Sequence, residues 1–168
     1  MSDFRAIQPG QIGAQDIEET STTQKHPLGT IVKAKDYAST DYGVGEFIYA
    51  VGVASTVVGS VVEIDMSGFT TALLDAGDTG GVGCAMSANV ASQYGWYQIH
   101  GLGVAKGLAS LADNAPCYAT ATDGSIDDAV VAGDEIYGMT TASALDTPSS
   151  GLALVNLSYP SIHDTGDV

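Results

Sequence analysis

The feature that most constrains the fold is a regular alternation of short apolar segments and turn residues that begins at Leu28. Segments rich in Val, Ile, Thr and aromatic residues recur every ~10 residues, with Gly, Asp, Asn and Ser between them. This spacing is typical of a β-barrel or β-sandwich, and no alternation of strand and helix patterns indicates a parallel sheet. The chain is therefore predicted to be all-β, with one compact barrel or sandwich domain over residues 28–160.

The expected strands are short and are bounded by turn signals. They cover residues 29–34, 46–51, 57–64, 70–74, 82–86, 95–101, 104–111, 115–120, 126–131, 135–140 and 151–157. Gly59 with Ser60 predicts a tight turn or a bulge, and Asp123 with Gly124 is a strong hairpin-turn pair. Residues 87–92 fit a single helical turn.

One expected strand, residues 95–101, places side chains of different kinds on its two faces. Trp96, Gln98 and His100 share one face, and Tyr97 and Ile99 share the other, because side chains alternate along a strand. One face is therefore expected to enter the core and the other to meet solvent or a partner.

The first 27 residues differ from the rest of the chain because they are polar, with isolated apolar residues. Ile7, Ile12 and Ile17 recur at a spacing that fits neither helix nor strand. Single apolar residues on an extended arm can anchor it to a neighbouring surface. A disordered tail is the alternative. Residues 161–168 are expected to form a C-terminal tail.

Charge restricts the partners that this chain can bind. Five Lys and Arg residues stand against 20 Asp and Glu, the net charge is −15, and no basic residue follows Lys106. Nucleic acid and anionic lipid are unfavourable partners for such a surface, because both need clustered basic residues. The N-terminus lacks a signal-peptide pattern and no apolar run approaches ~18 residues, so a soluble protein made in a cytoplasm is expected.

Metal and thiol chemistry is weakly supported by the residue spacing. Cys84 and Cys117 lie in apolar surroundings, which favours buried free thiols over a disulfide or a metal site. His26, His100 and His163 show no spacing that would hold a metal or a catalytic relay, so no cofactor is expected. For His100, a strand position at the edge of the core or at an interface is the simpler interpretation.

Other motifs have a structural and a functional interpretation. Residues 75–78 and 123–128 resemble incomplete calcium loops, but surface turns explain both. The aromatic residues of 94–97 form either a sugar-stacking platform or core packing. No phosphate-binding loop and no G-x-S-x-G motif occurs, so an enzyme is not expected unless a spatial cluster forms around His100.

Three segments carry a resemblance to a known class of protein. They are residues 25–30 (KHPLGT), 42–50 (YGVGEFIYA) and 93–99 (QYGWYQI). The pattern is similar to that of decoration, or cement, proteins on the capsids of tailed phages, and the likeness runs from Lys25 to Pro160. The resemblance implies a β-rich domain on the capsid exterior.

The resemblance also implies an assembly role without catalytic residues. The expected partner is the major capsid protein, with a homo-oligomer, trimeric where such proteins cover three-fold positions. Candidate capsid or subunit contacts are Ile7, Ile12, Ile17, His26, Trp96 and His100. The alternative is a head-fibre or knob-type module of a phage that binds glycans on the host surface.

Overall fold

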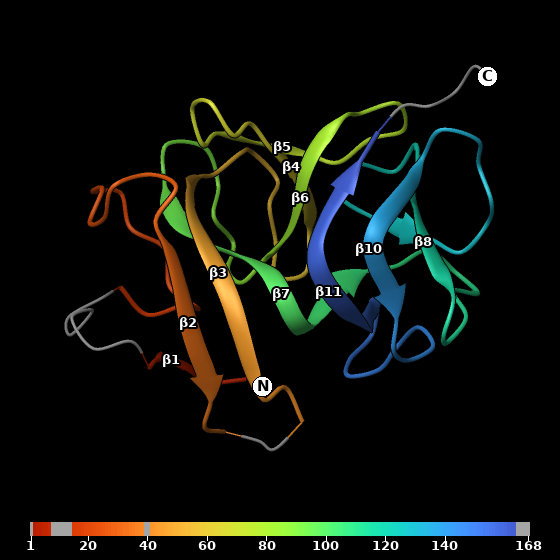
Figure 1. Ribbon diagram of the computed structural model, residues 1–168, viewed down its shortest axis with the longest axis horizontal. Coiled ribbons are helices and arrows are strands. Elements are labelled where there is room, and N and C mark those ends of the chain that lie inside the picture. Colours follow the sequence, from red (N-terminus) through yellow and green to blue (C-terminus); the bar gives the residue numbers. More distant parts are fainter. Residues whose placement is uncertain (1, 8–14, 39–40, 164–168) are drawn as a thin grey trace.

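The computed structural model describes residues 2–7, 15–38 and 41–163, and across these ranges the chain is all-β without a helix (Figure 1). The predicted all-β class is therefore confirmed. The strands are β1 (Phe4–Ala6), β2 (Ile31–Asp36), β3 (Val44–Val51), β4 (Val61–Ile64), β5 (Thr71–Leu73), β6 (Gly80–Ala85), β7 (Tyr94–Lys106), β8 (Pro116–Ala119), β9 (Ile126–Asp127), β10 (Glu135–Thr141) and β11 (Leu152–Ile162).

The strands form one large antiparallel sheet that folds over itself as a sandwich and does not close into a barrel. The main path runs β1-β2-β3-β7-β6-β11-β10-β8-β9, and β4 joins β5 to β6. β7 lies at the centre because it pairs with β3, β6 and β11. The strands near the N-terminus and those near the C-terminus therefore share one central strand.

The length of β7 corrects the sequence prediction, which expected separate strands over residues 95–101 and 104–111. The chain instead continues as one 13-residue strand to Lys106, and residues 107–111 are not in a strand. Gly101 lets the strand bend, because its φ is +97° and a Cβ there would lie 2.6 Å from the Val44 carbonyl oxygen. The Gln98 side chain supports the bend by donating from Nε2 to the carbonyl oxygens of His100 and Leu102.

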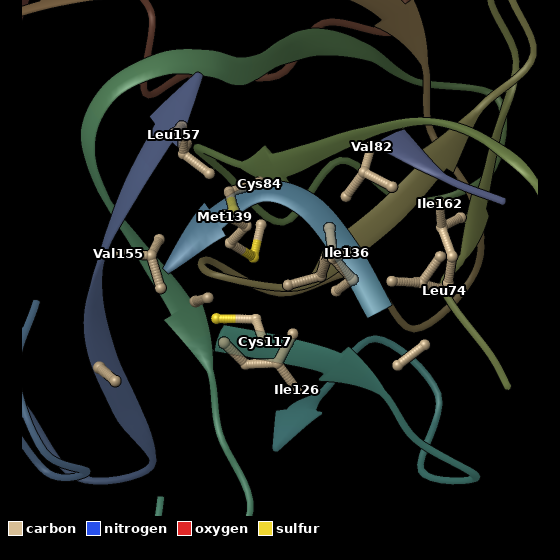
Figure 2. Packing of buried hydrophobic residues seen from close by; sticks show 14 of the residues in the cluster. Leu74, Val82, Cys84, Cys117, Ile126, Ile136, Met139, Val155, Leu157 and Ile162 are labelled. Carbon is tan, nitrogen blue, oxygen red and sulfur yellow. The ribbon is translucent and has the colours of Figure 1, made fainter. Parts of the chain in front are cut away.

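Buried side chains gather in three clusters around the folded sheet. The largest takes residues from β6, β8, β10 and β11, among them Cys84, Cys117, Met139 and Val155, which meet in the interior shown in Figure 2. A second cluster includes Phe47 and Trp96 on one face of β3 and β7. A third includes Ile48 and Tyr97 on the opposite face of the same strands.

Two of the predicted turns are present in the structure, and the predicted helical turn is not. Gly124 has a φ of +71° in the turn that joins the antiparallel strands β8 and β9, as the Asp-Gly pair predicts. Gly59 has a φ of +81° in the turn before β4. Residues 87–92 form turns without a helix.

The described parts of the first 27 residues lie on the domain. β1 pairs with β2 through a register that places Arg5 opposite Lys35. Farther along, Ser21 forms an antiparallel bridge with Tyr94 on β7. The segment is therefore hydrogen-bonded to β2 near its start and to β7 near its end. It also contributes buried side chains to the second cluster.

Candidate functional site

The N-terminal segment is fixed by a glutamine that the sequence analysis did not single out. Gln15 is buried, and the Tyr49 hydroxyl donates to its Oε1 at 2.9 Å. Its Nε2 donates to the carbonyl oxygens of Glu19 at 2.7 Å and Tyr94 at 3.0 Å. Its own carbonyl oxygen accepts from the indole Nε1 of Trp96 at 3.0 Å. Every polar group of Gln15 therefore has a partner, which is what burial of an amide side chain requires.

Trp96 and Ile17 belong to the chain's own core, which corrects their prediction as contact residues. Trp96 is fully buried and packs against Tyr49, with 4.8 Å between ring centroids. Ile17 is 2% exposed in the same cluster. Because neither side chain reaches the surface, neither is available to a partner of the folded chain.

His26 completes this aromatic group rather than presenting a free imidazole. Its Nε2 accepts a hydrogen bond of 3.0 Å from the backbone N–H of Gln15, which requires the neutral ring. The ring lies 5.1 Å from Tyr49 and 5.4 Å from Trp96, measured between centroids. Burial lowers the pKa of His26, and the charge on Lys25 adds to the decrease.

The other two isoleucines of the predicted arm differ from Ile17. Ile7 follows β1 and its side chain is 44% exposed, so it remains a candidate contact. Ile12 lies outside the described residues. The five-residue spacing therefore does not mark three equivalent anchors.

His100 lies at the surface in a cluster of polar side chains from four strands, β2, β3, β7 and β11, here called the charged cluster. Its ring lies 5.0 Å from that of Tyr159 on β11. The Tyr159 hydroxyl donates to Glu46 at 2.7 Å, and Lys33 forms an ion pair of 3.0 Å with the same carboxylate. The hydrogen bond from Tyr159 is the main cause of a lowered pKa at Glu46, and the bond from Lys33 adds to the decrease. Glu46 therefore stays ionised and anchors the cluster rather than exchanging protons.

An apolar groove, the outer groove, lies beside the charged cluster and has a volume of about 260 Å³. Tyr159 belongs to both features. The groove is lined by Ile31, Ile48, Ile64, Met66, Gly81, Val82, Ile99, Tyr159, Pro160 and Ser161. Ile31 is 47% exposed, and Met66 and Tyr159 are each 57% exposed. Large apolar side chains that remain exposed around a hollow are characteristic of a surface that binds an apolar group of a partner.

A second hollow, of about 400 Å³, lies where the N-terminal segment meets residues 148–152. Its wall includes Tyr42, Met86 and the half-buried Glu18, which accepts a hydrogen bond from the Ser2 hydroxyl. Burial raises the pKa of this carboxyl group, and the charges of Asp3 and Asp36 add to the increase. None of the candidate contact residues lines either hollow, but Tyr159 of the outer groove lies against the candidate contact His100, so the outer groove is the stronger candidate site.

The two thiols lie in the largest buried cluster. Cys84 and Cys117 are free and buried, as the sequence predicts. Burial raises the pKa of Cys117 to about 12 and that of Cys84 still further. Both therefore remain protonated near neutral pH, and a protonated thiol is a poor nucleophile and a poor metal ligand.

Of the two loops that resemble calcium sites, the one at residues 75–78 is held by hydrogen bonds within the chain. Asp78 accepts from the backbone N–H of Asp75, and Asp134 accepts from the backbone N–H of Gly77, both at 2.8 Å. Among the residues that the structure describes, no group of three or more His, Cys, Asp or Glu side chains is placed to hold a metal ion.

Comparisons with known proteins do not assign the chain to a family. No family model, no curated protein and no solved structure matches it. Within the described ranges, no helix has the length and apolar character needed to span a membrane.

Proposed function

We propose that this protein is a non-enzymatic virion protein that binds the outside of a tailed-phage capsid and stabilises the shell. The expected partner is the major capsid protein. The proposal begins from the likeness of residues 25–30, 42–50 and 93–99 to capsid decoration proteins. Its further support comes from where these segments lie in the fold.

The observation that carries the proposal is that these three segments, far apart in the sequence, pack together. Tyr49 and Trp96 stand opposite each other in the register of β3 and β7. His26 contacts the rings of both. The resemblance therefore concerns segments that pack together in one part of the domain.

The charge of the chain is compatible with a place on the capsid exterior. A net charge of −15 disfavours contact with packaged DNA, because phosphate repels a surface with few basic residues. Many copies on one shell add weak contacts into a large total effect, so tight binding by each copy is not required.

The glycan-binding alternative gains no support from the aromatic residues of 94–97. A sugar-stacking platform there would need open rings, but Trp96 and Tyr97 are both fully buried. A ring must be open on one face to stack on a sugar. We therefore propose the capsid role first.

Co-sedimentation tests the proposed function directly. Purified protein is mixed with expanded empty heads assembled from the major capsid protein encoded with it, and bound protein is measured after sedimentation. We expect saturable binding with a fixed number of copies per head. Protein that stays in the supernatant at every concentration would rule out the capsid role.

A further inference from the structure

The second hollow combines one carboxyl group with apolar walls from distant parts of the chain. Its volume of about 400 Å³ lies within the range of about 300–1,000 Å³ that is usual for sites that enclose a small ligand. Glu18 of the N-terminal segment lines one side. Aliphatic walls come from Val58 before β4, Met86 after β6, Val104 on β7 and Leu152 on β11. The hollow therefore fits an apolar group that ends in a polar or charged one.

Glu18 is the charged group of this hollow, and its charge is not neutralised within the described chain. Of the described residues that line the hollow, Glu18 alone has an ionisable carboxyl, amino or guanidinium group. Its hydrogen-bond donor, the Ser2 hydroxyl, is neutral. In the described part of the chain, Arg5 and Lys33 form their ion pairs with other carboxylates, and no Lys, Arg or His pairs with Glu18. A half-buried carboxylate in this position favours a cation from outside the chain.

The charges around the hollow are negative, and two groups in its wall respond to them. Burial is the main cause of a raised pKa at Glu18, and the charges of Asp3 and Asp36 add to the increase. The positive charge of the amino terminus opposes it, but as the smallest of the contributions. Burial also raises the pKa of Tyr42, and Asp36, Asp41 and Glu18 add to that increase. A place where nearby carboxylates disfavour a further anion is one where they favour a cation.

We propose that the second hollow binds a basic side chain, lysine or arginine, of a protein partner. The aliphatic stem lies along Val58, Met86 and Leu152, and the charged end reaches the Glu18 carboxylate beside the ring of Tyr42. Lysine and arginine both have an apolar stem and a cationic end, and an aromatic ring adds to the attraction for a cation. The inference rests on the proposed function only in naming the major capsid protein as the partner.

The charge of the whole chain favours a partner with exposed basic residues. A net charge of −15 attracts such a surface from a distance, and added salt weakens the attraction. Long-range attraction alone does not select one position on the molecule. A carboxylate in an apolar hollow does select one, because the ion pair formed there is shielded from water. The hollow therefore gives the attraction a specific point of attachment.

Methionine methyl groups report binding at this hollow separately from binding elsewhere. Met86 lines the hollow, Met66 lines the outer groove, and Met139 lies in the largest buried cluster. Protein with isotope-labelled methionine methyl groups is titrated with N-acetyl-lysine methylamide, and the methyl signals are followed by NMR. The corresponding norleucine compound is the control probe, because it has the aliphatic stem without the ammonium group.

Two pairs of matched variants test the charge and the space of the hollow. Glu18→Gln removes the charge but keeps an oxygen that accepts from Ser2, and Glu19→Gln makes the same change at an exposed neighbour outside the hollow. Val58→Lys places a cation in the hollow. Val57→Lys is its control, because the two valines are 47% and 46% exposed and only Val58 lines the hollow. Circular dichroism and the melting temperature establish that each variant is folded.

We expect the lysine probe to shift the Met86 signal saturably, with little change at Met66 and Met139. The norleucine probe should bind at least about tenfold more weakly, and so should the lysine probe to Glu18→Gln, because each lacks the charge-assisted contact. Val58→Lys should block the probe, since its own ammonium group occupies the hollow. The two control variants should bind the probe as the wild type does.

The same variants connect the hollow to the capsid. In co-sedimentation with expanded heads, Glu18→Gln and Val58→Lys should each raise the dissociation constant at least about tenfold, whereas Glu19→Gln and Val57→Lys should have much smaller effects.

Three results would overturn this inference. They are a Met86 signal that does not respond to the lysine probe, equal binding of the lysine and norleucine probes, and folded Glu18→Gln and Val58→Lys proteins that bind heads as the wild type does. A wild type that does not bind heads rules out the proposed function instead. The titration contains no capsid, so it tests the hollow in either case.

Discussion

At the scale of single residues, Gln15 joins the N-terminal segment to the sheet. It accepts hydrogen bonds from the Tyr49 hydroxyl and the Trp96 indole N–H, and it donates hydrogen bonds to two backbone carbonyl groups. Nothing in the local sequence distinguishes it from the other polar residues of the first 27. Its role depends on partners on β3 and β7, which lie far away in the sequence, so a pattern of neighbouring residues cannot reveal it.

Replacing Trp96 tests whether this aromatic group belongs to the core. Trp96→Ala should lower the free energy of unfolding by about 3–5 kcal/mol, the usual cost of removing a large buried aromatic side chain. Denaturant unfolding measures the change. Trp96→Phe retains a ring and should lose less. A Trp96→Ala protein as stable as the wild type would contradict the buried position.

His26 predicts a loss of stability in mild acid. Its pKa is lowered in the folded protein, whereas the unfolded chain has the ordinary value of about 6.5. Below pH 6.5 the unfolded state therefore binds protons that the folded state does not, and stability falls as the pH drops through the folded pKa. His26→Gln keeps an acceptor for the Gln15 N–H without titrating near neutral pH.

The measurement is the difference in free energy of unfolding between wild type and His26→Gln from pH 7.5 to 5. As the pH falls, we expect the free energy of unfolding to decrease less for the variant than for the wild type. The carboxyl groups titrate in both proteins, so their effect cancels in the comparison. A difference that is constant with pH would contradict the role of the neutral imidazole.

At the scale of elements, the strand-and-turn pattern predicted the fold class and most strand positions. It was wrong where β7 passes through Gly101, since two nearby glycines normally mark a break between strands. The bend is possible because Gln98 bonds to the carbonyl oxygens of His100 and Leu102. The outer groove was not predicted, because it is assembled from β2, β3, β4, β6, β7 and β11.

The N-terminal segment was predicted to be an extended arm, but the burial of Ile17 indicates that the segment contributes to the stability of the fold. Two isoleucines provide a matched comparison. Ile17→Ala should lower the free energy of unfolding by about 2–5 kcal/mol, because the side chain is fully packed. Ile7→Ala should change it by less than about 0.5 kcal/mol, because the side chain is exposed. Equal effects of the two substitutions would contradict the described packing.

At the scale of the whole molecule, charge is distributed unevenly. Three of the five basic residues, Arg5, Lys33 and Lys35, lie on β1 and β2, while the part of the chain after Lys106 has acidic residues alone among its Asp, Glu, Lys and Arg. An uneven distribution of this kind orients a molecule as it approaches a charged surface, and the effect weakens as salt is added.

If the protein stabilises a capsid, the gain must depend on how many sites are occupied. Binding to the assembled shell and not to separated subunits stabilises it by about 2.7 kcal/mol per site when free protein is at 100 times its dissociation constant. DNA release is measured against temperature for heads with and without the protein, at two salt concentrations. We expect release at a higher temperature as occupancy rises. Identical curves at full occupancy would leave a display role without stabilisation.

The continuity of β7 determines how the molecule unfolds. Because one backbone segment is hydrogen-bonded to β3 in one half and to β11 in the other, neither half keeps a complete sheet once the other has melted. Unfolding is therefore expected to be cooperative, with no stable half-folded form. Such a protein is either intact or unfolded, and proteases would find few partly opened copies to cleave.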